Sequence, residues 1–331
     1  MKTPNLAGHL QRFFTDRLLG QLGASPHTVA SYRDTFRLLL KYASKTCQRQ
    51  ASALNVDDLD VKLVGAFLKH LEQERHISVR SRNNRLSAIH AFFAQVCLND
   101  PTLSEHCQRV LGVPFKRFER GPVAFLTEEE ADALLKAPDP ATWLGRRDRV
   151  LLHVAVQTGL RNSELTQLQR QNVQLGAGAH VRCLGKGRKA RCTPLRSDVA
   201  SHLSTWLKEL SSNPATPVFP TAMGTPMSSD ALQRLVARHV ETAAKTHLSL
   251  QRKKVTPHTL RHTSAMNLLR RGVDITVIAL WLGHESIETT QMYLHADMAI
   301  KEKALGRTTK TNLTPKRYRP ADQLLAFLEG L

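Results

Sequence analysis

The chain has 331 residues, enough for two domains that each bury a core of their own. Its 47 Lys and Arg residues outnumber 28 Asp and Glu residues, and the formal net charge of +19 indicates a polyanionic partner, nucleic acid before membrane. Five irregularly spaced cysteines argue against a disulfide scaffold, and the lack of long apolar runs argues against a signal peptide or a membrane-spanning segment.

The positive charge is spread along the whole chain. Residues 1–125 hold 18 basic and 10 acidic residues, and residues 126–331 hold 29 and 18. Double-stranded DNA bound by two basic domains is the simplest interpretation, and a generically soluble basic protein is the alternative. Because both parts are basic, the charge does not belong to one detachable tail.

Apolar residues at helical spacing predict four amphipathic helices in the first third of the chain. They cover residues 6–22, residues 25–44 after the Ser25-Pro26 cap, residues 61–72, and a stretch that starts near Ser78 and runs to about Val96.

The fourth of these helices carries a polar cluster in its first turns. Arg and Asn side chains bond phosphates and base edges, so these residues are candidate DNA contacts. A solvated polar face is the alternative for any one of them. The candidates are Arg80, Arg82, Asn83, Asn84 and Arg85.

A charged stretch with a Gly-Pro break, residues 116–125, is the best linker in the sequence. Beyond it, Thr127 and Glu130 form a capping box for a helix over 128–135. An apolar helix over 149–158 ends at Gly159, and Arg161 then stands at the start of another helix. Glu164, one turn later, either orients Arg161 or complements the helix dipole.

Short strands are predicted at 173–175, 180–184 and 190–195, and the last two form a hairpin. The hairpin turn is G-K-G-R, residues 185–188. Lys186 at its tip can reach into a site or can be an ordinary solvated turn residue. Helices over 197–210 and 228–246 follow, separated by a Pro-rich loop.

The segment from 255 to 295 holds several polar residues that a helical core does not need. Thr256 and Pro257 predict the start of a helix. His258 and Arg261 then share a face near its N-terminus, which makes an anion site, most naturally for phosphate. A second apolar run follows Gly272, and after it come His284 and Tyr293.

Four motifs occur in order between Thr158 and Tyr293: T-G-L-R-N-S-E-L, G-K-G-R-K-A-R, H-T-L-R-H and L-G-H-E-S-I-E-T-T-Q-M-Y. Together they resemble the tyrosine recombinases, the phage integrase and Xer-type group of enzymes that break and rejoin DNA. The resemblance implies a mainly α fold with a small β-sheet and hairpin. It implies a helical core-binding domain at 1–115, a linker at 116–125, a mixed α/β catalytic domain at 126–300, and a basic tail with an amphipathic helix at 301–331.

The same resemblance implies a role for each motif residue. Arg161 and Arg261 would clamp the scissile phosphate, Lys186 would protonate the leaving 5′ oxygen, and Tyr293 would be the nucleophile. His258 would take part in proton transfer with the nucleophile. His284 would bond a non-bridging phosphate oxygen. Apart from these roles, Arg188 in the hairpin turn is a further candidate DNA contact. His262 is expected to be structural or a partner of these groups.

The chemistry asks for these residue types independently of the family. Negative charge builds on the non-bridging oxygens during attack, and guanidinium groups bind such oxygens bidentately. A covalent phosphotyrosine stores the energy of the broken bond, so strand exchange needs no ATP, and the sequence has no Walker-type motif. The candidate residues include no carboxylate cluster of the kind a two-metal nuclease uses. We therefore expect neither cofactor nor metal.

The expected function is site-specific recombination in DNA integration, transposition or chromosome dimer resolution, through a 3′-phosphotyrosine. The expected partners are double-stranded DNA and other protomers, a dimer at each site and a tetramer at synapsis, or a heteromer with related recombinases. We expect no membrane contact and a location in the bacterial cytoplasm, at the nucleoid.

The C-terminal helix could dock on its own domain or on a neighbour. A non-catalytic DNA-binding or architectural protein is the alternative, and a metal-dependent hydrolase using His258 and His262 is a third.

Overall fold

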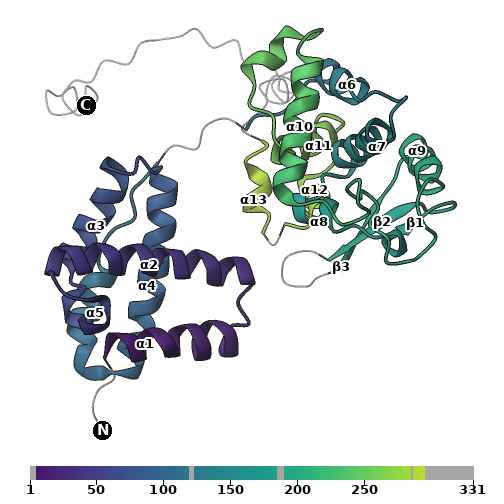
Figure 1. Cartoon of the computed structure of the whole chain (residues 1–331). Helices are drawn as coiled ribbons and strands as arrows, with labels where there is room; N and C mark the ends of the chain where they lie inside the picture. The colour runs from purple at the N-terminus through teal and green to yellow at the C-terminus, as the bar shows by residue number, and fades with distance from the viewer. Residues whose placement is uncertain (1–4, 119–122, 185–189, 285, 295–331) are drawn as a thin grey trace, which may run out of the picture. The chain divides into compact units, whose positions relative to one another are not determined.

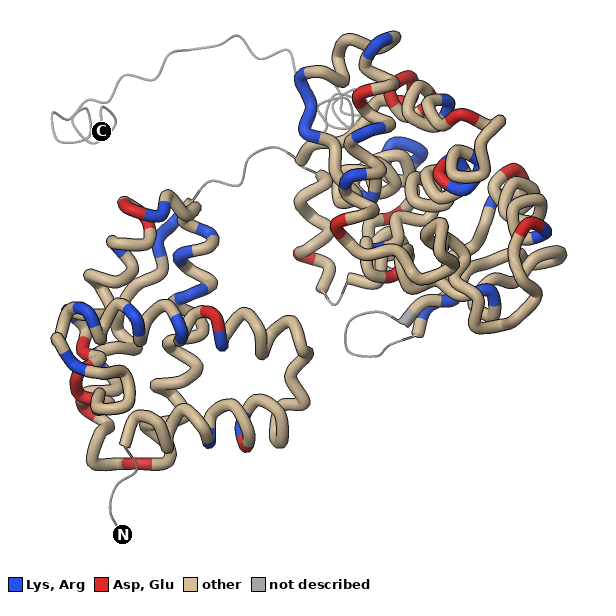
Figure 2. Tube along the Cα trace, viewed as in Figure 1, with Lys and Arg blue, Asp and Glu red and all other residues tan. Residues whose placement is uncertain are grey.

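The computed structural model describes residues 5–118, 123–184, 190–284 and 286–294 (Figure 1). The chain divides into two compact units, an N-terminal unit of Met1–Arg120 and a C-terminal unit of Gly121–Leu331. Lys and Arg residues are distributed over both units (Figure 2). The mainly helical fold with a small sheet that the sequence predicts is confirmed.

The N-terminal unit is entirely helical in its described part. All four predicted helices are present, and each begins at a side-chain cap, Asn5, Ser25, Asp60 or Ser78. The first one differs from expectation because its second half is a π-helix. The elements are α1 (Leu6–Arg12), the π-helix η1 (Phe13–Gln21), α2 (Pro26–Cys47), the single-turn 3₁₀ helices η2 (Ala51–Ala53) and η3 (Val56–Asp58), α3 (Val61–Gln73), α4 (Val79–Asn99), η4 (Pro101–Leu103) and α5 (Ser104–Leu111).

Aromatic side chains hold this unit together. The Phe13 ring meets Phe36 and Phe92 edge-on at centroid distances of 6.0 and 5.6 Å, and Phe36 meets Phe92 at 5.1 Å. Such edge-to-face pairs add roughly 0.5–1.5 kcal/mol each beyond the burial of their apolar area. The π-helix therefore supplies a central residue of the core although its hydrogen bonding is irregular.

The polar cluster of α4 divides between surface and interior. Arg80 and Asn84 are exposed, as a DNA contact requires. Arg82 is only 6% exposed, and its guanidinium donates to the Pro114 carbonyl oxygen at 2.9 Å. Arg85 donates to Thr35 Oγ1 at 3.0 Å. The burial of Arg82 counts against it as one of the candidate DNA contacts, because long-range packing uses its side chain.

Asn83 has a similar structural task. It is half-buried, donates to the Lys116 carbonyl oxygen at 2.8 Å and accepts the Lys116 backbone N–H at 3.1 Å. These two bonds fix the chain as it leaves the N-terminal unit.

The C-terminal unit combines helices with a three-stranded antiparallel sheet of order β1-β2-β3. The predicted capping box of Thr127 and Glu130 is present. The described elements are α6 (Glu128–Lys136), α7 (Trp143–Thr158), α8 (Asn162–Thr166), η5 (Arg170–Asn172), β1 (Val173–Gln174), β2 (His180–Leu184), β3 (Ala190–Pro194), α9 (Ser197–Leu207), α10 (Ser229–Ala243), η7 (Leu248–Arg252), α11 (Pro257–Arg270), α12 (Ile275–Leu282) and α13 (Glu288–Gln291).

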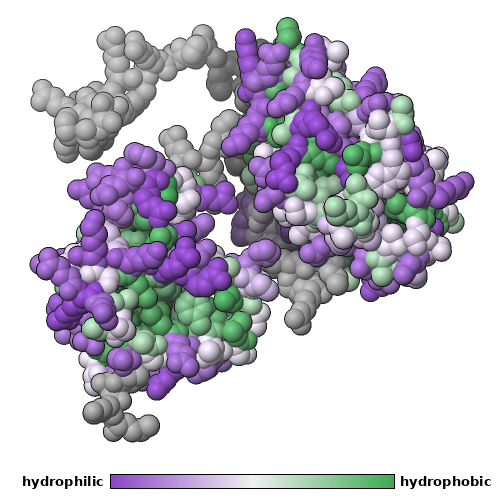
Figure 3. All heavy atoms as spheres, in the orientation of Figure 1, coloured by the Kyte–Doolittle hydropathy of each residue, from purple (hydrophilic) through white to green (hydrophobic). Residues whose placement is uncertain are grey.

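Helix α7 lies at the centre of this unit and packs against α6, α9 and α11 (Figure 1). Its buried residues include Leu151, Leu152 and Val154, each at most 1% exposed. Figure 3 shows hydrophobic patches on both units, each surrounded by hydrophilic residues. No helix in the described ranges is long and apolar enough to cross a membrane.

A fully buried carboxylate links α7 to α10. Asp148 is 0% exposed. Its Oδ1 accepts a hydrogen bond from Arg147 Nη2 at 2.7 Å, and its Oδ2 accepts one from Arg238 Nη2 at 2.8 Å. His239 Nε2 also lies 2.8 Å from Oδ2. A buried charge is stable only with such partners, and removing one member of a buried pair leaves the others uncompensated.

We expect Asp148→Asn to lower the free energy of unfolding of the C-terminal unit by about 3 kcal/mol, because three cationic or polar partners lose their carboxylate. Urea denaturation followed by tryptophan fluorescence measures this change. Asp132→Asn, at an exposed position of α6, is the matched control and should leave the transition unchanged. Equal transitions for the two variants would show that the Asp148 cluster does not stabilise the unit.

Candidate functional site

Arg261 lies in the second turn of α11 and is only 5% exposed. Its Nη1 donates to the Gly159 carbonyl oxygen at 2.6 Å, and its Nη2 donates to the Leu282 carbonyl oxygen at 2.8 Å. Burial lowers the pKa of Arg261 to about 10, and the neighbouring Arg161 acts in the same direction. The guanidinium therefore stays charged at neutral pH.

Arg161 precedes α8 and bonds the residue that follows Leu282. Its Nη2 donates to the Gly283 carbonyl oxygen at 2.5 Å, and its Nη1 donates to Glu164 Oε1 at 2.9 Å. Glu164 Oε2 also accepts the backbone N–H of Arg161 at 2.7 Å. Of the two roles open to Glu164 from the sequence, the structure shows that it orients Arg161.

The two arginines thus bind consecutive carbonyl groups of one loop. We name Leu282, Gly283 and His284 the 282–284 loop. Two N–H donors of each guanidinium are used in the bonds above, and a guanidinium has five. Both groups therefore retain donors for an anion.

Two glycines allow the close approach of these segments. Gly159 has a φ of 63°, and a Cβ there would lie 2.7 Å from Leu282 Cδ2. Gly283 has a φ of 65°, and a Cβ there would lie 2.7 Å from Arg191 Nη1. Both positions combine a left-handed backbone with insufficient room for a side chain, so each requires glycine.

Arg191 is a member of the site that the sequence analysis did not identify. It lies on β3, opposite Cys183 of β2, and forms a bidentate ion pair with Glu164 at 2.7 Å for both bonds. Burial alone would raise the pKa of Glu164, but the hydrogen bonds from Arg191 and from the Arg161 backbone outweigh it and lower that pKa. The available signal was the motif G-K-G-R-K-A-R, because Arg191 is its last residue.

His284 lies beside the arginines and is held by α13. Its Nδ1 is 2.7 Å from Thr290 Oγ1. Burial lowers the pKa of His284 to about 4, and the charges of Arg261 and Arg161 act in the same direction. The imidazole is therefore neutral at pH 7 and offers a hydrogen bond without a further positive charge.

Tyr293 follows α13 and is buried, with 1% of its surface exposed. Its hydroxyl lies 3.0 Å from His262 Nδ1, and its ring is nearly parallel to that of His284 at a centroid distance of 6.5 Å. Burial raises the pKa of Tyr293, and the charge of Arg261 opposes that rise. The phenol thus lies in the electrostatic field of one of the two arginines.

Two histidines of α11 lie beside this phenol in different ways. His262 makes the hydrogen bond, and burial followed by the charges of His258 and Arg261 lowers the pKa of His262 to about 4. His258 is exposed, and its ring centroid is 6.5 Å from that of His262. His262 was expected to be structural or a partner of the site, and the structure shows that it contacts the tyrosine directly.

The structure therefore brings together five of the six residues that the family resemblance selects, Arg161, His258, Arg261, His284 and Tyr293. The sixth, Lys186, and the neighbouring Arg188 lie outside the described residues. The strand that follows this segment carries Arg191, which bonds Glu164 at the arginine site.

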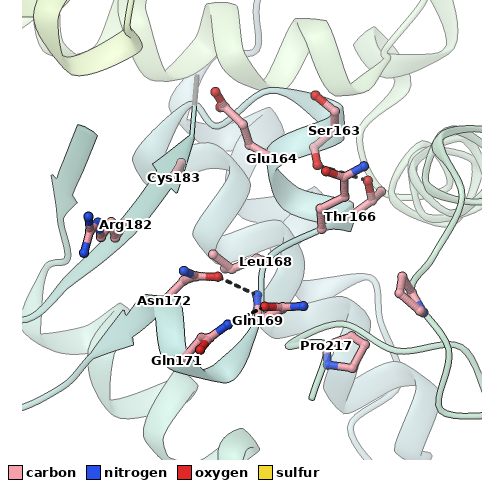
Figure 4. A pocket seen from close by; sticks show the side chains of 12 residues that line it. Ser163, Glu164, Thr166, Leu168, Gln169, Gln171, Asn172, Arg182, Cys183 and Pro217 are labelled. Atoms are coloured by element: carbon pink, nitrogen blue, oxygen red, sulfur yellow. Dashed lines mark hydrogen bonds between the residues drawn. The ribbon is translucent and has the colours of Figure 1, made fainter. Parts of the chain in front are cut away.

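A polar cavity of about 430 Å³ opens beside α8 (Figure 4). Ser163, Glu164 and Thr166 of α8 line one side, and Arg182 of β2 lines another. Neither Arg161 nor Arg261 is among its lining residues. Glu164, which bonds Arg161, is the residue that the cavity and the arginine site share.

Comparisons with known proteins match both units. The phage integrase family model matches residues 124–299, and the model of the phage integrase N-terminal SAM-like domain matches residues 11–97. An integrase/recombinase of Sinorhizobium fredii, y4rC, is 51% identical over 330 residues, which are 100% of this chain and 99% of that protein. The tyrosine recombinase XerC of Pelobacter propionicus is 33% identical over 289 residues, 87% of this chain and 90% of XerC.

The fold also matches a solved structure. It is the XerH site-specific recombinase bound to the palindromic difH substrate, with a TM-score of 0.66 and 22% identity over 86% of this chain and 81% of that one.

We expect His262 and His284 to titrate with midpoints near 4, because burial and nearby guanidinium groups disfavour their charged forms. In the unfolded chain both titrate near 6.5. The unfolded state therefore binds more protons between these values, and the protein should lose stability as the pH falls from about 6.5 towards 4.

NMR titration of the imidazole Cε1 resonances, assigned with His262→Asn and His284→Asn, measures both midpoints. Midpoints near 6.5 would show that the two rings are solvated and would contradict the buried arrangement.

Proposed function

Because this chain belongs to the phage integrase family and is a tyrosine recombinase, an enzyme that cuts and rejoins DNA, we propose that it joins specific DNA sites through a covalent bond between Tyr293 and a 3′ phosphate. The observation that carries this proposal is the convergence of Arg161 and Arg261 on the 282–284 loop, next to the buried Tyr293. Integration, transposition and chromosome dimer resolution are all served by this chemistry.

The two guanidinium groups would bind the non-bridging oxygens of the scissile phosphate. They are held by backbone carbonyl groups before DNA arrives, so little reorganisation is needed in the transition state. Neutral His284 would add one hydrogen bond to the same oxygens. A single preorganised donor of this kind is typically worth about 3–4 kcal/mol.

The covalent step exchanges one ester bond for another. The Tyr293 oxygen forms a bond to phosphorus, and the bond from phosphorus to the 5′ oxygen breaks. The phenolic proton passes to a neighbouring base, for which His262 Nδ1 at 3.0 Å is placed, with His258 next to it. Lys186 would give a proton to the leaving 5′ oxygen. A 5′ hydroxyl of a second strand then reverses the step and releases Tyr293.

This exchange keeps the number of phosphoester bonds constant, so it needs no nucleotide hydrolysis. The positive charge that a metal ion would supply in a metal-dependent nuclease is supplied here by arginine side chains. We therefore propose catalysis without metal or ATP.

The N-terminal unit would bind DNA as a core-binding domain, corresponding to residues 1–115, and residues 126–300 would form the catalytic domain after a linker at 116–125. Arg80 and Asn84 are exposed on α4 and are the contacts we retain from the polar cluster there. Arg188 would contact DNA from the hairpin turn. These are proposals about this chain's own residues.

A homo-oligomer on DNA, a dimer at each site and a tetramer at synapsis, would bring two strands together, and a heteromer with a related recombinase would serve equally. Helix α12 exposes apolar surface that such an assembly could cover, with Val277 47% exposed and Leu280 76% exposed. The tail at 301–331 lies outside the described residues, and its sequence predicts an amphipathic helix. We propose it as the segment that docks on a neighbour or on its own domain. We place this activity in the bacterial cytoplasm, at the nucleoid.

The proposal predicts a covalent protein–DNA adduct on a nicked suicide substrate, in which loss of a short strand prevents religation. Denaturing electrophoresis should show the adduct for the native protein with or without a chelator. Tyr293→Phe should abolish it because the attacking oxygen is missing. Tyr42→Phe, a tyrosine packed in the N-terminal unit, is the matched control and should keep it.

Two other results would overturn the proposal. DNA binding without any adduct would favour a non-catalytic DNA-binding protein. Cleavage that a chelator abolishes would favour a metal-dependent hydrolase.

Arg261→Ala should slow adduct formation by roughly 10²–10³-fold or more, because one phosphate donor group is lost. Its affinity for a DNA half-site, measured by gel shift, should change little, since many phosphate contacts share the binding energy. Arg271→Ala, exposed at the other end of the same helix, is the control. A parallel loss of binding and cleavage in Arg261→Ala would make Arg261 an affinity contact only.

A further inference from the structure

We propose that Arg191 is a positioning residue for the recombination chemistry, and that it acts by neutralising Glu164 so that Arg161 stays available to the scissile phosphate. This inference rests on the proposed function, and it assigns a task to a residue outside the motif positions that carry the chemistry there.

The contacts rank Arg191 as the principal partner of Glu164. Both of its bonds to the carboxylate are 2.7 Å long, whereas Arg161 makes one side-chain bond of 2.9 Å. The side chain of Arg191 is 11% exposed and that of Glu164 is 4% exposed, against 26% for Arg161. The buried ion pair is therefore between β3 and α8, and Arg161 lies at its solvent-facing edge.

The position of Glu164 creates an electrostatic problem for the reaction. Its carboxylate orients Arg161, but a buried negative charge beside that guanidinium repels a phosphate whose own negative charge grows in the transition state. It also competes with the phosphate for the N–H donors of Arg161. Arg191 binds both carboxylate oxygens and so compensates most of this negative charge. The Arg161 side chain then makes only one bond to Glu164, to Oε1.

Arg191 also touches the loop that both catalytic arginines bind. A Cβ at Gly283 would lie 2.7 Å from Arg191 Nη1 and 3.0 Å from its Cδ. The Arg191 side chain therefore lies close to Gly283 and places a positive charge beside the 282–284 loop. The same side chain thus connects β3, α8 and the 282–284 loop.

A purely structural role for Arg191 predicts a different pattern of mutational effects. If Arg191 only packs, replacing it and replacing Glu164 should damage the protein independently. If it neutralises Glu164, removing the charge of Glu164 should make Arg191 dispensable. The two cases separate in a double-mutant cycle.

The test uses the full chain and the nicked suicide DNA substrate under single-turnover conditions, with the rate of adduct formation measured on the DNA-bound fraction. The variants are Arg191→Met, Glu164→Gln and the two combined. Each is assayed below its own melting temperature, and half-site affinity is measured alongside.

We expect Arg191→Met to slow adduct formation by roughly 10–100-fold, the usual range for a residue that orients the groups in contact with the reacting centre. Half-site affinity should stay within about threefold, since the phosphate contacts that dominate affinity are unchanged. Adding Glu164→Gln should restore the rate to that of Glu164→Gln alone.

Equal fractional losses from Arg191→Met in the presence and absence of Glu164 would overturn the inference, as would an unchanged rate in Arg191→Met. If Arg191→Met does not fold, Arg191→Lys replaces it in the same cycle, because a single ammonium neutralises the carboxylate incompletely and cannot bind it bidentately. Absence of any adduct from the native protein would instead overturn the proposed function, so the two failures are distinct.

Discussion

The site depends on the bonds from two guanidinium groups to the carbonyl oxygens of Leu282 and Gly283. These bonds join α8 to α11 and the end of α12, which lie about a hundred positions further along the chain. A carbonyl group is neutral, so it orients an arginine without cancelling its charge. The backbone therefore holds both cations in place while leaving them free to meet an anion.

The groups around the arginines are arranged to preserve that positive charge. Arg191 neutralises Glu164, so this carboxylate competes only weakly with a phosphate for the arginine pair. His284 is uncharged at pH 7, so it adds no repulsion to the two guanidinium groups. The raised pKa of Tyr293 makes its phenol a weak nucleophile until another group accepts the proton. His262 Nδ1 lies 3.0 Å from that hydroxyl oxygen. In the proposed mechanism, binding of the phosphate and activation of the nucleophile therefore fall to different side chains.

Local signals in the sequence predicted most helices and the hairpin, because caps such as Ser25, Thr127 and Thr256 act within one helical turn. The family motifs selected the residues that meet at the site. Neither the local signals nor the motifs could predict contacts between residues that are distant in the sequence, because these contacts depend on how the whole unit packs. Arg82 is drawn inward by a carbonyl 32 residues away, and Arg191 finds Glu164 only through the register of the sheet. The contact of His262 with Tyr293 likewise spans 31 positions and two loops.

The most direct measurement is a structure of the Tyr293→Phe protein bound to uncleaved target DNA. Our account predicts the scissile phosphate between Arg161 and Arg261, with its non-bridging oxygens within hydrogen-bonding distance of both guanidinium groups. It also predicts that the ring of residue 293 faces the phosphorus opposite the 5′ oxygen. A phosphate bound elsewhere on the C-terminal unit, with both arginines still bonded only to backbone carbonyls and Glu164, would contradict the account.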